Sequence, residues 1–303
     1  MKKYLILLTL NITLTVQLLA QQSPEFTMYM MNPFIYNPAV AGTANYWEIR
    51  TNDRFQWVGF KNAPVTNIVS AFGPDPTKDV GYGGNIYNDV TGPVSITGAN
   101  GAYTYNMPLT PDIRASFGLE LGILDYSLDL SSIEFFIPDP TLGNQALTKI
   151  EPDASAGVYV YNSQFNAGLS ANHLFNLHED LTLKQIGVTE LQTHFYMMGG
   201  YRYIVDREWT LEPGIVINKV LAAPFQFELY GKAIYRNTVW GGLSLRTQDA
   251  ISLILGYTHE RRIFLGFAWD YSLTDIRKYS AGSYELVIGY NFDSIKKMAK
   301  KRK

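Results

Sequence analysis

Several segments of this chain alternate between apolar and polar residues with a period of two, and this pattern constrains the fold more than any other feature. From Phe225 to Arg236 every second position is mostly apolar, and the positions between them include Gln226 and Glu228. The segments 113–123 and 263–271 repeat the alternation. Such a period predicts β-strands. Strands of this length exceed those usual in soluble domains and match the tilted strands that cross a membrane.

Turn-forming residues divide the chain into about fourteen strands, an even number, as bacterial single-chain membrane barrels require. We expect the strands near residues 46–57, 63–73, 79–88, 94–106, 112–124, 154–161, 164–174, 191–204, 208–218, 225–236, 238–247, 250–258, 261–271 and 283–292. The longest connections all follow odd-numbered strands, and they are 125–153, 175–190, 218–224 and 272–282. Because such barrels keep their periplasmic turns short, this parity predicts a closed antiparallel barrel with both mature termini in the periplasm.

The composition agrees with a membrane barrel but does not require one. Aromatic residues make up 14% of the chain, charged residues 17%, and the mean hydropathy is −0.06. Alternating apolar and polar faces average out to such values in a barrel, although a soluble sandwich is compatible with them as well. The periodicity therefore decides between these classes.

The first twenty residues have the layout of a secretory signal peptide. Lys2 and Lys3 precede an apolar run that begins at Tyr4, and Ala20 offers a small residue for cleavage. Cleavage there leaves 23 basic and 27 acidic residues, a formal charge of −4, which argues against a nucleic-acid partner. The chain has no cysteine, which excludes disulfides, thiolate metal sites and a lipid anchor on cysteine.

Residues 21–45, which we call the strap, contain two Asn-Pro steps among methionine and aromatic residues. Proline disfavours a helix before it, so the strap reads as a turn-rich segment. An exposed apolar run of this kind is rarely tolerated, and we expect it to pack against the periplasmic mouth or the lumen. Asn32 and Asn37 are expected to cap its turns, and Arg50 or Arg54 to meet its carbonyls. The residues expected at this contact are Asn32, Pro33, Tyr36, Asn37, Pro38, Gly42, Arg54 and Trp57.

The inward-facing positions of the expected strands carry charges of both signs. A polar network in the lumen is expected to include Arg50, Arg114, Glu120, Glu228, Lys232, Arg236 and Glu285. Mixed signs favour ion pairs across a filled interior, whereas a selective channel tends to show rings of one sign. We therefore expect a lumen that is closed at rest.

No set of residues in the sequence predicts catalysis, a metal site or a cofactor. The histidines, His173, His178, His194 and His259, have no second ligand at metal-binding spacing on a helix. His178 and Asp180 could imitate part of a hydrolase site at an outer rim. We expect the protein not to be an enzyme.

Further stretches of the sequence follow one family pattern. They are Arg54-Phe55-Gln56-Trp57-Val58-Gly59, Ala63-Pro64-Val65-Thr66, Asn88-Asp89 before Gly92, and Trp269-Asp270-Tyr271-Ser272-Leu273 before Gly282-Ser283-Tyr284-Glu285. Together with the strap, they resemble the PorP/SprF family of type IX secretion outer-membrane proteins. Tyr284 departs from the family pattern, in which a histidine is expected between the serine and the glutamate.

The resemblance implies an outer-membrane barrel that assists secretion or surface attachment of specific proteins, including gliding adhesins in some family members. The expected partners are the outer-membrane lipid bilayer, type IX secretion components and a secreted or surface-anchored protein. The alternatives are a transporter for a hydrophobic small molecule and a barrel enzyme. The expected organisation is a signal peptide at 1–20, the strap at 21–45, the barrel at 46–292 and a basic periplasmic tail at 293–303.

Overall fold

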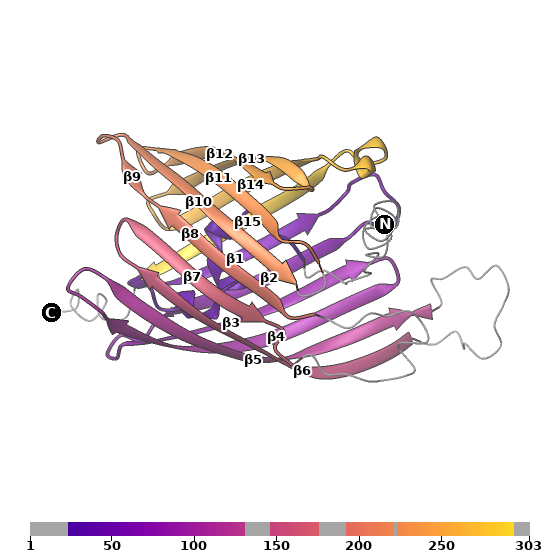
Figure 1. The fold of residues 1–303 in the computed structure, drawn as a ribbon, viewed down its shortest axis with the longest axis horizontal. Coiled ribbons are helices and arrows are strands. Elements are labelled where there is room, and N and C mark those ends of the chain that lie inside the picture. The colour runs from indigo at the N-terminus through magenta and orange to yellow at the C-terminus, as the bar shows by residue number, and fades with distance from the viewer. Residues whose placement is uncertain (1–23, 131–145, 176–191, 221–222, 294–303) are drawn as a thin grey trace, which may run out of the picture.

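The strands of the chain form one antiparallel sheet that closes on itself into a barrel (Figure 1). The computed structural model describes residues 24–130, 146–175, 192–220 and 223–293. The strands are β1 (Tyr46–Phe55), β2 (Val65–Pro74), β3 (Val80–Thr91), β4 (Val94–Pro108), β5 (Arg114–Asp129), β6 (Ala146–Tyr161), β7 (Phe165–Asn172), β8 (His194–Tyr201), β9 (Tyr203–Ile204), β10 (Trp209–Val220), β11 (Gln226–Tyr235), β12 (Val239–Arg246), β13 (Ala250–His259), β14 (Ile263–Ser272) and β15 (Ser283–Asp293). β1 pairs with β15 from Tyr46 opposite Asp293 to Phe55 opposite Tyr284, which closes the barrel.

The short β9 continues β8, so the wall has fourteen strands and the predicted fold class is confirmed. Strand β8 ends at Tyr201 and β9 begins at Tyr203, which leaves a break between them. Gly200 lies opposite Gly214 and Tyr203 lies opposite Leu211, so the register with β10 is the same on both sides of this break. Pro213 of β10 lies opposite the break. Because proline has no N–H to donate, the ladder loses hydrogen bonds at this position.

The hairpin of β5 and β6 extends further than the sequence predicts. The expected strand 154–161 begins instead at Ala146, and residues 125–129 and 146–153 of the expected connection are strand. Residues 146–153 pair with 122–129 in one unbroken register. The sequence pattern missed this extension because Glu151-Pro152-Asp153 reads as a turn, whereas cross-strand pairing keeps these residues extended.

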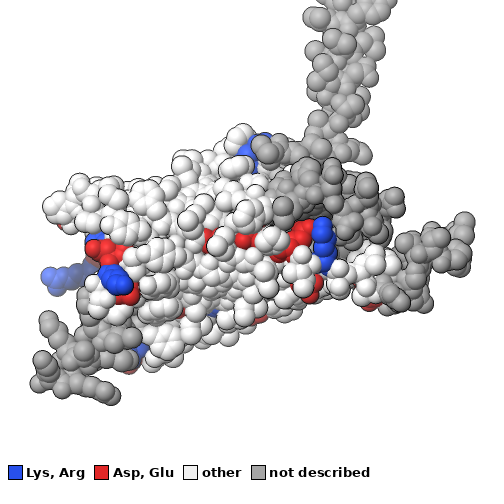
Figure 2. All heavy atoms as spheres, turned by 90° about the horizontal axis from the view of Figure 1, so that it is seen from below, with Lys and Arg blue, Asp and Glu red and all other residues white. Residues whose placement is uncertain are grey.

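The period-two alternation places apolar side chains on the outside of the barrel and polar ones in the lumen. On β5, Leu119, Leu121 and Ile123 are 65%, 64% and 56% exposed, whereas Glu120 between them is buried. Uncharged side chains cover most of the face shown in Figure 2. This outer surface has the apolar character that a lipid bilayer requires. No helix within the described ranges is long and apolar enough to cross a membrane.

The two mouths of the barrel differ in the length of their connections. One mouth, the short-turn mouth, carries the turns 75–79, 109–113, 162–164, 205–208, 236–238 and 260–262, and the other, the long-loop mouth, carries the remaining connections, including 56–64 and 273–282. At the short-turn mouth, backbone and side-chain donors of Thr77 lower the pKa of Asp75, and the backbone N–H groups of Trp209 and Glu208 lower the pKa of Asp206. Tight turns of this kind are typical of the periplasmic side.

The strap crosses the lumen from the long-loop mouth to the short-turn mouth. Pro24 lies beside Gln56 and Pro64 of the β1–β2 loop, whereas Gly42 lies against Gly81 at the start of β3. The chain then turns into β1 at the short-turn mouth, where Tyr46 lies opposite Asp293. Pro24 and Asp293 therefore lie at opposite mouths. The two mature termini, which the sequence predicted at one mouth, lie outside the described residues. The signal peptide and the tail after Asp293 lie outside the described residues.

The assignment of the mouths can be tested with single cysteines, because the natural chain has none. Lys61→Cys lies in the β1–β2 loop at the long-loop mouth, and Asp112→Cys lies in a turn at the short-turn mouth. We expect a membrane-impermeant maleimide added to intact cells to label Lys61→Cys and to leave Asp112→Cys unlabelled until the outer membrane is permeabilised. The reverse labelling pattern would show that the barrel has the opposite orientation.

Candidate functional site

The strap is folded as three short 3-10 turns: η1 (Tyr29–Met31), η2 (Pro33–Ile35) and η3 (Pro38–Val40). Pro33 and Pro38 each begin a turn, where a missing N–H costs nothing. The Asn37 side chain caps η3 by accepting a hydrogen bond from the N–H of Ala39 at 2.9 Å. Asn32 makes no such cap, contrary to expectation. Instead its amide donates to Asn52 Oδ1 at 2.9 Å and to Ser70 Oγ at 2.8 Å on the barrel wall.

The apolar side chains of the strap form the centre of the lumen core. Phe26, Met28, Tyr29, Phe34, Tyr36 and Val40 are all less than a tenth exposed. The ring of Tyr36 stacks on Tyr196 of β8 at 4.5 Å between centroids, and Phe34 stacks on Phe72 of β2 at 4.8 Å. Each fully buried side chain of this size contributes about 1.5–3 kcal/mol. The strap is thus part of the hydrophobic core and not an appendage.

A buried ionic network fixes the start of the strap to the closing strands of the barrel. Arg54 of β1 pairs with Asp270 of β14 at 2.7 Å and with Glu285 of β15 at 3.4 Å. The two carboxylates also hold Thr27 of the strap. Its N–H donates to Glu285 Oε2 at 2.7 Å, and its hydroxyl lies 2.8 Å from Asp270 Oδ2. The N–H of Met28 donates to the other oxygen of Glu285 at 3.2 Å.

Arg246 of β12 extends this network along the lumen. Its guanidinium pairs with Glu228 at 3.0 Å, with Asp249 at 2.6 Å and with Glu25 of the strap at 3.3 Å. It also donates to the hydroxyl of Thr27 at 3.0 Å. Since Arg246 is 2% exposed, these charges are removed from water and depend on one another.

Arg50 of β1 meets the middle of the strap, as the sequence predicted for one of the two arginines. Its Nε donates to the carbonyl of Met31 at 3.2 Å, and its Nη2 pairs with Glu48 at 2.5 Å. Its guanidinium also lies over the ring of Phe264 at 4.6 Å. Side chains of β1 therefore hold the strap from Thr27 to Asn32.

Glycines in the wall let the strap backbone approach the strands closely. A Cβ on Gly118 of β5 would lie 2.4 Å from the backbone N of Ala39, and one on Gly81 of β3 would lie 2.5 Å from the carbonyl of Ala41. A Cβ on Gly157 of β6 would lie 2.1 Å from Asn37 Oδ1. Any side chain at these positions would displace the strap, so the wall is shaped to contain it.

The remaining predicted residues divide into those inside the lumen and those outside it. Lys232 is inside, where it pairs with Glu212 at 2.7 Å, and Glu120 faces a cavity described below. Arg114 pairs with Asp79 at the short-turn mouth and is 36% exposed, and Arg236 pairs with Glu208 in an exposed turn. These two do not join the network because they lie at strand ends, beyond the enclosed part of the barrel.

Sequence reasoning missed two central members of the network, Thr27 and Asp270. The sequence could have predicted Asp270 as a member of the network, because it falls on the inward face of the alternation in 263–271. Thr27 carries no charge and no periodic signal. Its role depends on where the strap lies in the barrel, which no local pattern contains.

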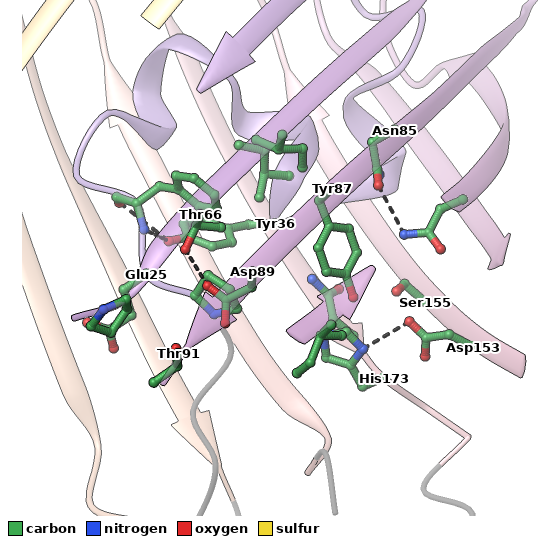
Figure 3. Close-up of a pocket in the computed structure, with 18 of the residues that line it drawn as sticks. Glu25, Tyr36, Thr66, Asn85, Tyr87, Asp89, Thr91, Asp153, Ser155 and His173 are labelled. Carbon is green, nitrogen blue, oxygen red and sulfur yellow. Dashed lines mark hydrogen bonds and ion pairs between the residues drawn. The ribbon is translucent and has the colours of Figure 1, made fainter. Parts of the chain in front are cut away.

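A cavity of about 320 Å³ lies beside the first residues of the strap and extends inward from the long-loop mouth. Trp57, from the β1–β2 loop, lines its outer part. Figure 3 shows Tyr87 and Asp89 of β3 and Asp153 of β6 around it, with His173 near Asp153. His173 Nδ1 lies 2.9 Å from Asp153 Oδ2.

The sequence predicted no metal site. No group of three or more His, Cys, Asp or Glu side chains within the described part of the chain could hold a metal ion. His178 and Asp180 lie outside the described residues.

The fold and the filled lumen define a closed antiparallel β-barrel of the outer-membrane type with its own N-terminal segment inside. Residues 18–290 match the family model described as type IX secretion system membrane protein PorP/SprF. The chain belongs to the PorP/SprF family, as the resemblance of the strap and the later motifs predicted. Family membership and fold together support an outer-membrane location.

Solved structures share the barrel architecture at very low sequence identity. The deltaS2S3 mutant of the TodX monoaromatic hydrocarbon channel is 9% identical with a TM-score of 0.54, over 86% of this chain and 94% of that chain. The CymD monoaromatic hydrocarbon channel is 9% identical with a TM-score of 0.51, over 89% and 93%. The Pseudomonas putida toluene transporter TodX is 9% identical with a TM-score of 0.51, over 91% of this chain and 96% of that chain. This likeness shows the fold alone. A search of curated proteins found no match.

Proposed function

We propose that this protein is a non-enzymatic accessory barrel of the type IX secretion system, which assists the secretion or surface attachment of specific proteins. The family match over residues 18–290 carries this proposal. The filled lumen supports it, because a barrel core built from the chain's own strap leaves the mouths and loops as the surfaces for a protein partner.

The loops at the long-loop mouth form a connected surface suited to such a partner. The N–H of Val58 in the β1–β2 loop donates to the carbonyl of Gly282 at 2.9 Å, and the N–H of Ala281 donates back to Val58 at 2.8 Å. Beside this bridge, Phe60 is 50% exposed and Tyr279 is 72% exposed. Exposed aromatic side chains on a braced loop pair are common anchors in protein recognition.

Transport of a hydrophobic small molecule is the alternative, since the hydrocarbon channels named above have the same architecture. The strap and its ion pairs obstruct such a path, and the cavity beside them has carboxylates in its lining. Planar-bilayer recordings distinguish the two functions. We expect little steady conductance from the intact protein, and large open-pore currents would favour transport.

The proposed function is tested by affinity isolation of the tagged barrel from outer membranes, followed by mass spectrometry. We expect secretion components and a large surface protein to co-purify. The double variant Phe60→Ser/Tyr279→Ser should lose the surface protein while the amount of barrel in the membrane stays the same. The control Leu109→Ser changes an apolar side chain that is 51% exposed at the other mouth and should keep it. Recovery of equal amounts of the surface protein with the double variant and with the control would contradict recognition at these loops. Co-purification of lipid without any protein would contradict the proposed function.

A further inference from the structure

The charges in the lumen are compensated on one side of the strap and not on the other. Toward β11–β15 and β1, the buried carboxylates Asp270, Glu285 and Glu228 each pair with Arg54 or Arg246. Toward β2–β8 lies the mouth cavity, and none of the described residues that line it is a lysine or arginine. Among the described residues, the carboxylates of this cavity therefore have no lysine or arginine partner, and only Asp153 has a ring nitrogen of His173 beside it.

Glu120 of β5 shows the deficit most clearly. It lines the cavity, is 9% exposed, and no described lysine or arginine forms an ion pair with it. It accepts a hydrogen bond from Asn85 Nδ2 at 3.3 Å and another from the hydroxyl of Ser155. Asp153, 4% exposed, has the His173 ring and the N–H of Ala154 as partners among the described residues. A carboxylate this far from water needs a cation or several strong donors.

Asp89 adds a third carboxylate nearer the mouth, where it accepts hydrogen bonds from the hydroxyls of Thr66, at 2.5 Å, and Thr91. Between these acids the cavity is lined by the aromatic rings of Tyr36, Tyr87 and Trp57. Aromatic faces attract cations and also pack against methylene groups. Carboxylates and rings together match a cation carried on an apolar stem.

We propose that the mouth cavity is a binding site for an ammonium or guanidinium group on a short apolar stem. The group ion-pairs with Glu120 and Asp153, while the stem packs between Tyr36 and Trp57. Such a group occurs in free amines and also in the lysine and arginine side chains of a polypeptide. Both sources offer the same chemistry to the cavity, which is open toward the long-loop mouth. This site is independent of the proposed secretion role, because it concerns only what the barrel binds.

The test is a titration of the purified barrel in detergent, with intrinsic tryptophan fluorescence and calorimetry as the two readouts. Agmatine carries a guanidinium at one end of a four-carbon stem and an ammonium at the other, and n-butanol is the neutral probe with a four-carbon stem. We expect agmatine to bind with a Kd of about 1 mM or tighter, and butanol to bind at least tenfold more weakly. Equal binding of the two probes, or no binding of agmatine, would overturn the proposal.

Two variants locate the site and one controls for charge. Glu120→Gln and, near the mouth, Asp89→Asn should each weaken agmatine binding, Glu120→Gln by tenfold or more. Asp112→Asn removes one negative charge at the opposite mouth and should leave binding unchanged. Heat-modifiable migration in gels shows that each variant is folded. Binding that survives Glu120→Gln and Asp89→Asn in folded protein would contradict the assignment.

A second titration identifies the source of the cation. It uses a peptide with an acetylated N-terminus and an amidated C-terminus that carries one internal arginine. Tighter binding of the peptide than of agmatine means that the cavity binds a side chain of a polypeptide. Binding of agmatine alone means that it takes a free cation. Either result supports the site and identifies its occupant, whereas failure of both probes contradicts it.

Discussion

Replacing Arg54 with methionine is expected to lower the free energy of unfolding by about 3–5 kcal/mol, the range for removing one partner of a buried ion pair. Arg54 is 3% exposed and faces both Asp270 and Glu285. Without it, two carboxylates remain buried at the seam where β14 and β15 meet β1. The same carboxylates hold Thr27, so the start of the strap should loosen together with the seam.

The measurement is a urea titration of the refolded barrel in detergent, followed by heat-modifiable migration. Arg236→Met is the matched control, because its ion pair with Glu208 is exposed to solvent and should contribute little. The triple variant Arg54→Met/Asp270→Asn/Glu285→Gln removes the stranded charges and should recover part of the lost stability. A stability of Arg54→Met equal to that of Arg236→Met would show that the network does not hold the barrel closed.

Placing an alanine at Gly118 is expected to push the strap away from the wall. The new Cβ would lie 2.4 Å from the backbone N of Ala39 and 2.6 Å from its Cα. Both atoms belong to the strap backbone, so no side chain can rotate away from the clash. Overpacking of this kind costs about 1–3 kcal/mol, and here the strain falls on the contact between η3 and β5.

Hydrogen exchange of the strap amides reports this displacement directly. We expect the amides of residues 39–43 in Gly118→Ala to exchange at least tenfold faster than in the natural protein. Gly101→Ala on the neighbouring β4 is the control, because a Cβ there meets nothing within 4 Å. Unchanged exchange in Gly118→Ala would mean that the strap does not depend on its close fit to the wall.

The sequence by itself determined the barrel. Period-two alternation depends only on which residues avoid water, and connection length depends on local turn chemistry. Both are local properties of the sequence, which is why the fourteen-strand wall and the parity of the connections could be predicted. The strap motif and the later stretches also identified the family. The one large error in the wall, at 146–153, arose where pairing with β5 overrode the turn-forming residues of that segment.

Only the tertiary structure decided what fills the lumen and which charges meet there. Arg54 and Glu285 are separated by most of the chain, and their contact exists because β1 closes against β15. Arg236 was expected beside them, yet it lies in an exposed turn because the enclosed part of the barrel ends before it. The direction of the strap, from the long-loop mouth to the short-turn mouth, was also invisible in the sequence. A segment with no period of its own takes its path from the shape around it, here from wall glycines such as Gly118 and from the carboxylates that hold Thr27.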